Sequence, residues 1–216
     1  MARIRLGTDQ RRAQLLELGV ELFARGAYDA LTTDTIASEG GISKGLLFHY
    51  FGSKRGFYVA TIEHVAQLLL DRVVLDRALA PYESVLDAVE RFLDFVVGYP
   101  AIYRALLRGG LGADGESQAI VERVRWTIVH RVLELLDPEA GPAPEEPVPL
   151  AHTAALRLYA WVGATEALSL VWIDRGLARD RIRTLIIESF APVLAAWPRD
   201  QRERARGAAE PRSPSP

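Results

Sequence analysis

Basic side chains stand at the expected start of two neighbouring helices in the first quarter of the chain. Lys44 follows Ser43, a residue type that caps helix N-termini. Lys54 and Arg55 follow Ser53 in the same way. Cations at these positions oppose the helix dipole by about 0.3–1 kcal/mol each. A bound anion reverses that balance, because helix N-termini and basic side chains together hold phosphate. These residues therefore indicate binding of a phosphate-rich partner.

The helix that would follow Ser43 has an unusual composition for a buried helix. Residues 44–50 contain a lysine, a glycine, a histidine and a tyrosine. Gly45 lowers helix stability by about 1 kcal/mol relative to alanine. That cost is explained if the backbone must approach a partner closely at this position.

The charge of the chain restricts a nucleic-acid site to a local patch. The 216 residues hold 26 Lys and Arg against 28 Asp and Glu, a formal net charge of −2. Residues 1–60 hold eight of these cations and six of the anions, so the positive excess lies in the N-terminal part. The chain as a whole is not a polycationic nucleic-acid binder.

Helical periodicity dominates the sequence, and no segment shows the sustained alternation of a strand. The predicted helices span about residues 8–25, 34–39, 44–50, 53–79, 83–97, 100–108, 116–136, 150–175 and 179–197. A Pro-rich loop is expected at 138–149 and a polar, disordered tail at 198–216. The sequence thus predicts an all-α protein of about nine helices. The two short helices, joined by Gly40-Gly41, form a helix-turn-helix pattern.

The stretch from Leu31 to Lys54 resembles the N-terminal signature of the TetR/AcrR family of bacterial transcriptional regulators. It reads Leu-Thr-Thr-Asp-Thr-Ile-Ala-Ser-Glu-Gly-Gly-Ile-Ser-Lys-Gly-Leu-Leu-Phe-His-Tyr-Phe-Gly-Ser-Lys. The family pattern has a Thr-Thr pair, Ile-Ala, Ala-Gly-Val-Ser, Gly-Thr-Leu-Tyr, Tyr-Phe and Ser-Lys. The specific match covers roughly residues 9–58, and the rest agrees only in helix number and length. The resemblance implies a helix-turn-helix DNA-binding domain at 1–58 and an effector-binding and dimerisation domain at 59–197.

The same resemblance implies which residues contact DNA. It assigns DNA-binding positions to Thr33, Ser43, Lys44, Gly45, Phe48, His49, Tyr50 and Lys54. Among them Lys44, Gly45 and Phe48 lie where the family's recognition helix faces base edges. The others, apart from the helix-capping Ser43, lie where it holds phosphates. Leu46 and Phe48 stand where Thr and Tyr are common, so they lack a hydroxyl but can still contact a thymine methyl group.

The remaining motifs do not favour an enzyme, a metalloprotein or a membrane protein. The chain has no cysteine, and no two of its four histidines stand four residues apart. No serine has the setting of a nucleophile elbow, and no residue set indicates a cofactor. No signal peptide and no uncharged apolar run of about 18 residues is present, so a cytoplasmic location is expected.

The predicted helix at 150–175 is apolar on two opposite sides, so both sides should be covered. We assign one side to a dimer interface built with the helix at 179–197. Its predicted contact residues are Leu158, Trp161, Leu168 and Trp172. Glu166 lies on the opposite stripe, where a covered carboxylate needs a partner. Two interpretations remain open for it: a salt bridge in the core or interface, or a polar group in a ligand cavity.

The C-terminal part also holds aromatic residues that suit a mostly apolar pocket. The predicted ligand-binding residues are Phe92, Tyr103, Trp126, His130 and Tyr159, together with Glu166. An aromatic stripe of this kind also occurs in an ordinary core. We therefore expect a small hydrophobic or amphipathic effector, and neither a nucleotide nor a metal.

Together these features predict a homodimeric transcriptional regulator, a repressor that binds a palindromic operator and is released by its effector. The alternative is a helical small-molecule-binding protein without DNA binding. A helical enzyme is a third class, but no catalytic cluster favours it. The intact Ser43-Lys44-Gly45 segment and Lys54 favour the regulator.

Overall fold

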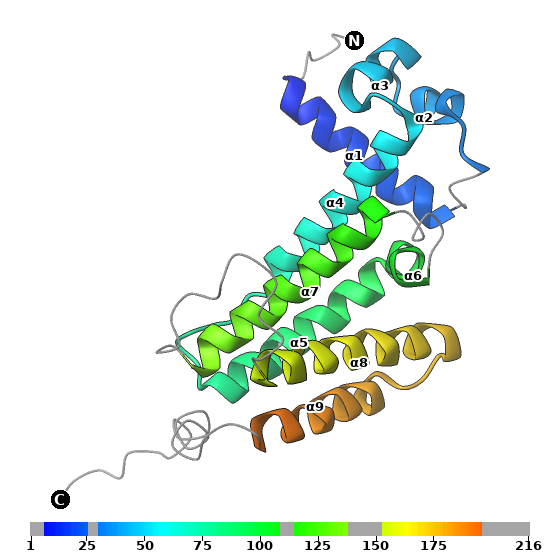
Figure 1. Cartoon of the computed structure of the whole chain (residues 1–216). Coiled ribbons are helices and arrows are strands. Elements are labelled where there is room, and N and C mark those ends of the chain that lie inside the picture. Colours follow the sequence, from blue (N-terminus) through cyan, green and yellow to red (C-terminus); the bar gives the residue numbers. More distant parts are fainter. Residues whose placement is uncertain (1–6, 26–29, 109–114, 138–152, 196–216) are drawn as a thin grey trace, which may run out of the picture. The chain divides into compact units, whose positions relative to one another are not determined.

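The computed structural model describes residues 7–25, 30–108, 115–137 and 153–195 (Figure 1). Within these ranges the regular elements are nine α-helices, and none is a strand. They are α1 (Thr8–Arg25), α2 (Thr33–Glu39), α3 (Lys44–Phe51), α4 (Lys54–Arg72), α5 (Pro81–Gly98), α6 (Pro100–Arg108), α7 (Gly115–Leu136), α8 (Thr153–Arg175) and α9 (Arg179–Ala195). The predicted all-α class is confirmed. The predicted Pro-rich loop and the predicted tail at 198–216 lie outside the described residues.

The chain divides into two compact units. The first comprises Met1–Leu68 and Tyr99–Val121, and the second comprises Leu69–Gly98 and Glu122–Pro216. The first unit therefore extends beyond the predicted boundary at residue 58 and includes α6, which packs against α1. Helices α4 and α7 each contribute residues to both units.

The core of the first unit joins α1, α2, α3 and the start of α4. Ile36 of α2 and Leu47 of α3 are fully buried. The Phe23 ring of α1 meets the Tyr58 ring edge-on, with 4.9 Å between centroids, and lies 6.0 Å from the Phe57 ring. The Phe51 ring of α3 meets the Phe57 ring edge-on, with 5.0 Å between centroids. Leu47 and Phe51 thus anchor α3 to the core, while Lys44, Phe48 and His49 remain exposed.

Helix α4 ends at Arg72, seven residues before the predicted end at about residue 79. Arg131 of α7 donates through Nη1 to the carbonyl oxygens of Leu70, at 2.6 Å, and Val73, at 3.1 Å. A guanidinium on these carbonyls satisfies acceptors that a helix end leaves open. Asp76 then forms a local turn by accepting a hydrogen bond from the Ala78 amide at 2.8 Å.

In the second unit, α8 and α9 lie side by side and bury large side chains between them (Figure 1). Trp161 Nε1 donates to the Ile186 carbonyl at 3.1 Å, and its ring lies 4.7 Å from the Phe190 ring. Helix α9 is also tied to α5, because Arg179 and Arg183 both pair with Glu90.

This packing covers most of the predicted dimer face within one chain. Leu158 is fully buried within one chain, and Trp161 and Trp172 are buried as well. These three side chains are already covered by their own protomer and cannot supply an extensive contact with a second one. Of the four predicted residues, only Leu168 is partly exposed. The spacing of apolar residues identified the two apolar sides of α8, but it does not show which side the same chain covers.

Candidate functional site

Side-chain caps define the starts of α2, α3 and α4. The three bonds are Thr35 N to Thr32 Oγ1 at 3.1 Å, Leu46 N to Ser43 Oγ at 3.1 Å and Gly56 N to Ser53 Oγ at 2.9 Å. Each one satisfies an amide that a helix start leaves unpaired. Thr33, expected at the start of the second helix, is its first helical residue, and Thr32 is the cap.

Glycines shape the two turns around α3. Gly41, between α2 and α3, has φ +60°, and Gly52, between α3 and α4, has φ +71°. Both lie in the left-handed region, which side-chain-bearing residues rarely adopt. The caps and turns together fix α3 between its two neighbouring helices, as a helix-turn-helix requires.

Helix α3 exposes most of the residues that were predicted to contact DNA. Ser43, Lys44, Gly45, Phe48 and His49 are exposed, whereas Thr33, Tyr50 and Lys54 are partly buried. The side chain of Phe48 is 43% exposed, which is unusual for an aromatic residue on a folded surface. The His49 and Tyr50 rings lie edge to face with 5.7 Å between centroids. The structure therefore groups a lysine, a phenylalanine and a histidine on one exposed helix.

Asp34 is a member of this surface that the sequence interpretation missed. Its Oδ1 lies 2.6 Å from Lys44 Nζ, with the two side chains 71% and 51% exposed. An ion pair this exposed stabilises a fold by only about 0–1 kcal/mol. A second exposed pair joins Arg25, the last residue of α1, to Glu39, the last residue of α2, at 2.7 Å. The acidic first turn of the short second helix was the signal available in the sequence.

Two glycines of this region differ in the room around them. An added Cβ at Gly45 would meet only Ser43 Oγ, at 3.8 Å. At Gly56 it would collide with the Phe51 carbonyl oxygen and lie 3.4 Å from Ser53 Oγ. The absence of a side chain at Gly45 is therefore not required by packing within the chain.

We accordingly expect opposite stability effects from alanine at these two positions. Gly45→Ala should raise the free energy of unfolding by up to about 1 kcal/mol, because alanine favours helix. Gly56→Ala should lower it by about 1–3 kcal/mol, because the obstructing atom is backbone and cannot rotate away. Urea unfolding followed by circular dichroism measures both. Equal effects of one sign would contradict the difference in space.

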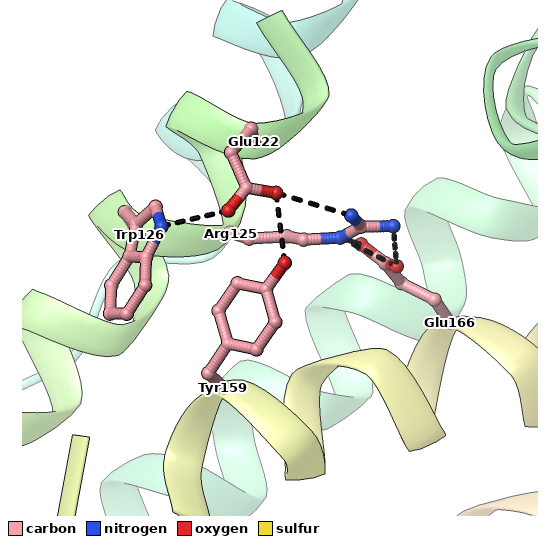
Figure 2. A network of polar contacts seen from close by, with 5 residues as sticks. All are labelled: Glu122, Arg125, Trp126, Tyr159 and Glu166. Atoms are coloured by element: carbon pink, nitrogen blue, oxygen red, sulfur yellow. Dashed lines mark hydrogen bonds and ion pairs between the residues drawn. The ribbon is translucent and has the colours of Figure 1, made fainter. Parts of the chain in front are cut away.

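A polar network joins α7 to α8 in the second unit (Figure 2). Arg125 of α7 binds Glu166 of α8 through two nitrogens, Nε to Oε1 at 3.1 Å and Nη2 to Oε2 at 2.7 Å. Glu122 accepts hydrogen bonds from Trp126 Nε1 at 2.8 Å and from the Tyr159 hydroxyl at 2.9 Å. Glu166 therefore makes a salt bridge within one protomer, and its predicted role in a ligand cavity stays a prediction.

The ionisation of these groups follows from their burial. The Glu166 side chain is 16% exposed, and its burial raises the pKa of the carboxyl above the ordinary value despite the opposing effect of Arg125. The Glu166 carboxylate in turn raises the pKa of Arg125. Burial, followed by the nearby Glu122, raises the pKa of Tyr159. Burial lowers the pKa of His130, which favours the neutral imidazole.

Four of the six predicted ligand-binding residues lie in or beside this network. The Trp126 ring lies 4.9 Å from the Tyr159 ring and 6.0 Å from the His130 ring, and Glu166 completes the group. Phe92 is buried on α5, and Tyr103 belongs to α6 of the first unit. The prediction did not include Glu122 and Arg125. Their spacing to Trp126 on one helix face was the signal available in the sequence.

None of the described helices is long and apolar enough to cross a membrane. In the same part of the chain, no three His, Cys, Asp or Glu side chains gather as metal ligands would.

Comparisons with known proteins agree with this architecture. Residues 15–61 match the family described as "Bacterial regulatory proteins, tetR family". Residues 81–202 match "Tetracyclin repressor-like, C-terminal domain". The crystal structure of a tetR-family transcriptional regulator from Streptomyces coelicolor superposes with a TM-score of 0.76 at 30% identity. That match covers 95% of this chain and 92% of the other.

Two curated relatives match over part of their length. The HTH-type transcriptional activator FasR of Mycolicibacterium smegmatis is 30% identical over 139 residues, which cover 63% of this chain and 64% of FasR. The HTH-type transcriptional repressor KstR2 of Mycobacterium tuberculosis is 35% identical over 98 residues, which cover 45% of this chain and 44% of KstR2. The chain therefore spans less than two thirds of the length of either relative.

The helix-turn-helix of α2 and α3 is followed by a helical C-terminal part in the same polypeptide. This is the architecture of a bacterial transcriptional regulator. The chain belongs to the TetR family of these regulators.

Proposed function

We propose that this protein is a homodimeric repressor that binds a palindromic operator through α3 and is released by a small hydrophobic or amphipathic effector. The observation that carries the DNA-binding part is the exposed surface of α3, where Lys44, Phe48 and His49 stand on a helix anchored by the buried Leu47. A helix of this kind fits the major groove, with half-sites one helical turn or a multiple of it apart.

The residues around α3 suit two kinds of DNA contact. Lys44 and Phe48 are exposed side chains that can reach base edges, a lysine toward guanine and an apolar ring toward a thymine methyl group. Lys54 begins α4, where the helix N-terminus and the ammonium suit a phosphate. Gly45, which has open space around it, permits the close approach of the DNA backbone or a base.

Two lysine substitutions test this assignment. We expect Lys44→Ala to weaken operator binding by about 1–3 kcal/mol and to relax the preference at one base position per half-site. Lys54→Ala should weaken all duplexes alike and reduce the dependence of affinity on salt. Gel-shift titration with DNA flanking the gene, at two salt concentrations, measures both. Sequence-independent losses in both variants would show that Lys44 reads no base.

The proposed dimer uses the outward faces of α8 and α9. Val171 and Leu185 are exposed on these neighbouring helices, and Leu168 is partly exposed one turn from Val171. An apolar surface shared by two adjacent helices suits a four-helix bundle with a second copy. This surface replaces Leu158, Trp161 and Trp172 as the proposed contact.

The proposed effector site lies beside the network of Figure 2. The rings of Trp126, Tyr159 and His130 provide apolar surface. The Arg125–Glu166 ion pair provides polar groups that can orient a ligand. The effector must bind better to a conformation in which the recognition helices are misplaced, since otherwise it would not shift the equilibrium.

The alternative, a helical ligand-binding protein without DNA binding, makes a different prediction in the same gel-shift experiment. It requires that no duplex from the flanking DNA is retained at any salt concentration. The capped helices and the exposed Lys44 favour the regulator over this alternative.

A further inference from the structure

Asp34 places a carboxylate on the surface that we assign to DNA. It lies in the first turn of α2, and Lys44 is the first residue of α3. The 2.6 Å contact between Asp34 Oδ1 and Lys44 Nζ therefore crosses the helix-turn-helix. Both side chains are exposed, so the pair stands in the region that a duplex would occupy.

Fold stability does not account for this pair. Water and salt weaken an ion pair between two exposed side chains. Asp34 alone suits the start of α2, because an anion there complements the helix dipole. On a surface that approaches phosphates, however, the same carboxylate repels the DNA backbone. Its contact with Lys44 calls for an explanation in terms of what the lysine binds.

The chemistry of the ammonium group supplies that explanation. A lysine ammonium has three hydrogen-bond donors on a flexible four-carbon stem, so an unrestrained lysine can reach the nearest phosphate. When Asp34 accepts a hydrogen bond from the ammonium, the direction of the lysine stem is restricted. The negative charge of Asp34 also disfavours phosphate oxygens nearby. Two donors then remain, and guanine O6 and N7 offer two acceptors in the major groove.

We propose that Asp34 determines sequence specificity by positioning the Lys44 ammonium toward a base edge and away from the phosphates. The inference rests on the proposed function, in which α3 enters the major groove. Asp34 is a positioning residue in this scheme, since it acts through Lys44.

Asp34→Asn tests the proposal, with Glu39→Gln as the matched control. Both variants remove one carboxylate from an exposed ion pair of the same helix. The probes are a duplex of about 30 base pairs, enriched by the wild-type protein from a random-sequence library, and a shuffled duplex of the same composition.

The measured quantity is the ratio of the two dissociation constants at fixed salt. We expect Asp34→Asn to lower this specificity ratio about tenfold, mainly through tighter binding of the shuffled duplex. Glu39→Gln should leave the ratio unchanged.

The variant Asp34→Asn/Lys44→Ala separates positioning from a general charge effect. If Asp34 acts through Lys44, the double variant has the same specificity ratio as Lys44→Ala alone. A ratio that falls further in the double variant overturns the proposal. So does an unchanged ratio in Asp34→Asn, or an equal fall in Glu39→Gln. If the wild-type protein enriches no duplex, the proposed function itself is wrong. If the wild-type protein enriches a duplex and Asp34→Asn keeps the same specificity ratio, only the role of Asp34 is wrong.

Discussion

A Val171→Glu variant is expected to sediment as a monomer and to bind operator DNA about 100-fold more weakly than the wild-type protein. Val171 on α8 is 44% exposed and Leu185 on α9 is 39% exposed. In the proposed four-helix bundle a carboxylate at either position would be buried without a partner. A monomer holds one half-site at a time, so it loses the effective concentration that links the two half-sites of a palindrome.

Analytical ultracentrifugation and gel-shift titration check this prediction, and Leu185→Glu should behave in the same way. Val97→Glu is the matched control, because Val97 is an exposed apolar residue of the second unit that lies on α5. It should leave the dimer intact. Trp172→Glu would instead lower stability, since Trp172 is buried within its own chain. Dimers that persist in both Val171→Glu and Leu185→Glu would place the interface elsewhere.

The helix starts around α3 could be predicted from sequence because their causes are local. Ser43 and Ser53 each accept a hydrogen bond from an amide three residues further along the chain. Gly40 and Gly52 directly follow the short helices α2 and α3. The end of α4 could not be predicted in this way. It depends on Arg131, which is about 60 residues away in sequence.

The candidate sites divide in the same manner. The exposed residues of α3 follow from helix periodicity once Leu47 is assigned to the core. The Asp34–Lys44 pair depends instead on how two helices cross. On α8, periodicity identified two apolar sides but not which one α9 covers. The partner of Glu166 is Arg125, 41 residues earlier, and only the packing of α7 on α8 brings them together.

An Arg125→Met variant is expected to lose about 3 kcal/mol of unfolding free energy at neutral pH. Methionine keeps much of the side-chain volume but leaves the mostly buried Glu166 carboxylate without its guanidinium. Urea unfolding measures the loss. Arg77→Met is the matched control, because it breaks an exposed pair with Glu134 and should cost under about 1 kcal/mol. The double variant Arg125→Met/Glu166→Met should recover most of the stability, since no unpaired charge remains at position 166. Glu122, which also pairs with Arg125 at 3.3 Å, keeps its hydrogen bonds from Trp126 and Tyr159.

The pH dependence of the Arg125→Met deficit identifies the buried carboxylate as its cause. Burial already raises the pKa of Glu166, and Arg125 opposes that effect, so removing the arginine should raise the pKa further. A carboxyl with a raised pKa in the folded state binds its proton more tightly there than in the unfolded chain. Its contribution to stability is present at low pH and is lost as pH rises through the folded-state pKa. The deficit should therefore be smallest near about pH 4 and grow toward about pH 8. If the deficit stays constant over this range, or persists in full in the double variant, lost packing around residue 125 is its cause and the unpaired charge is not.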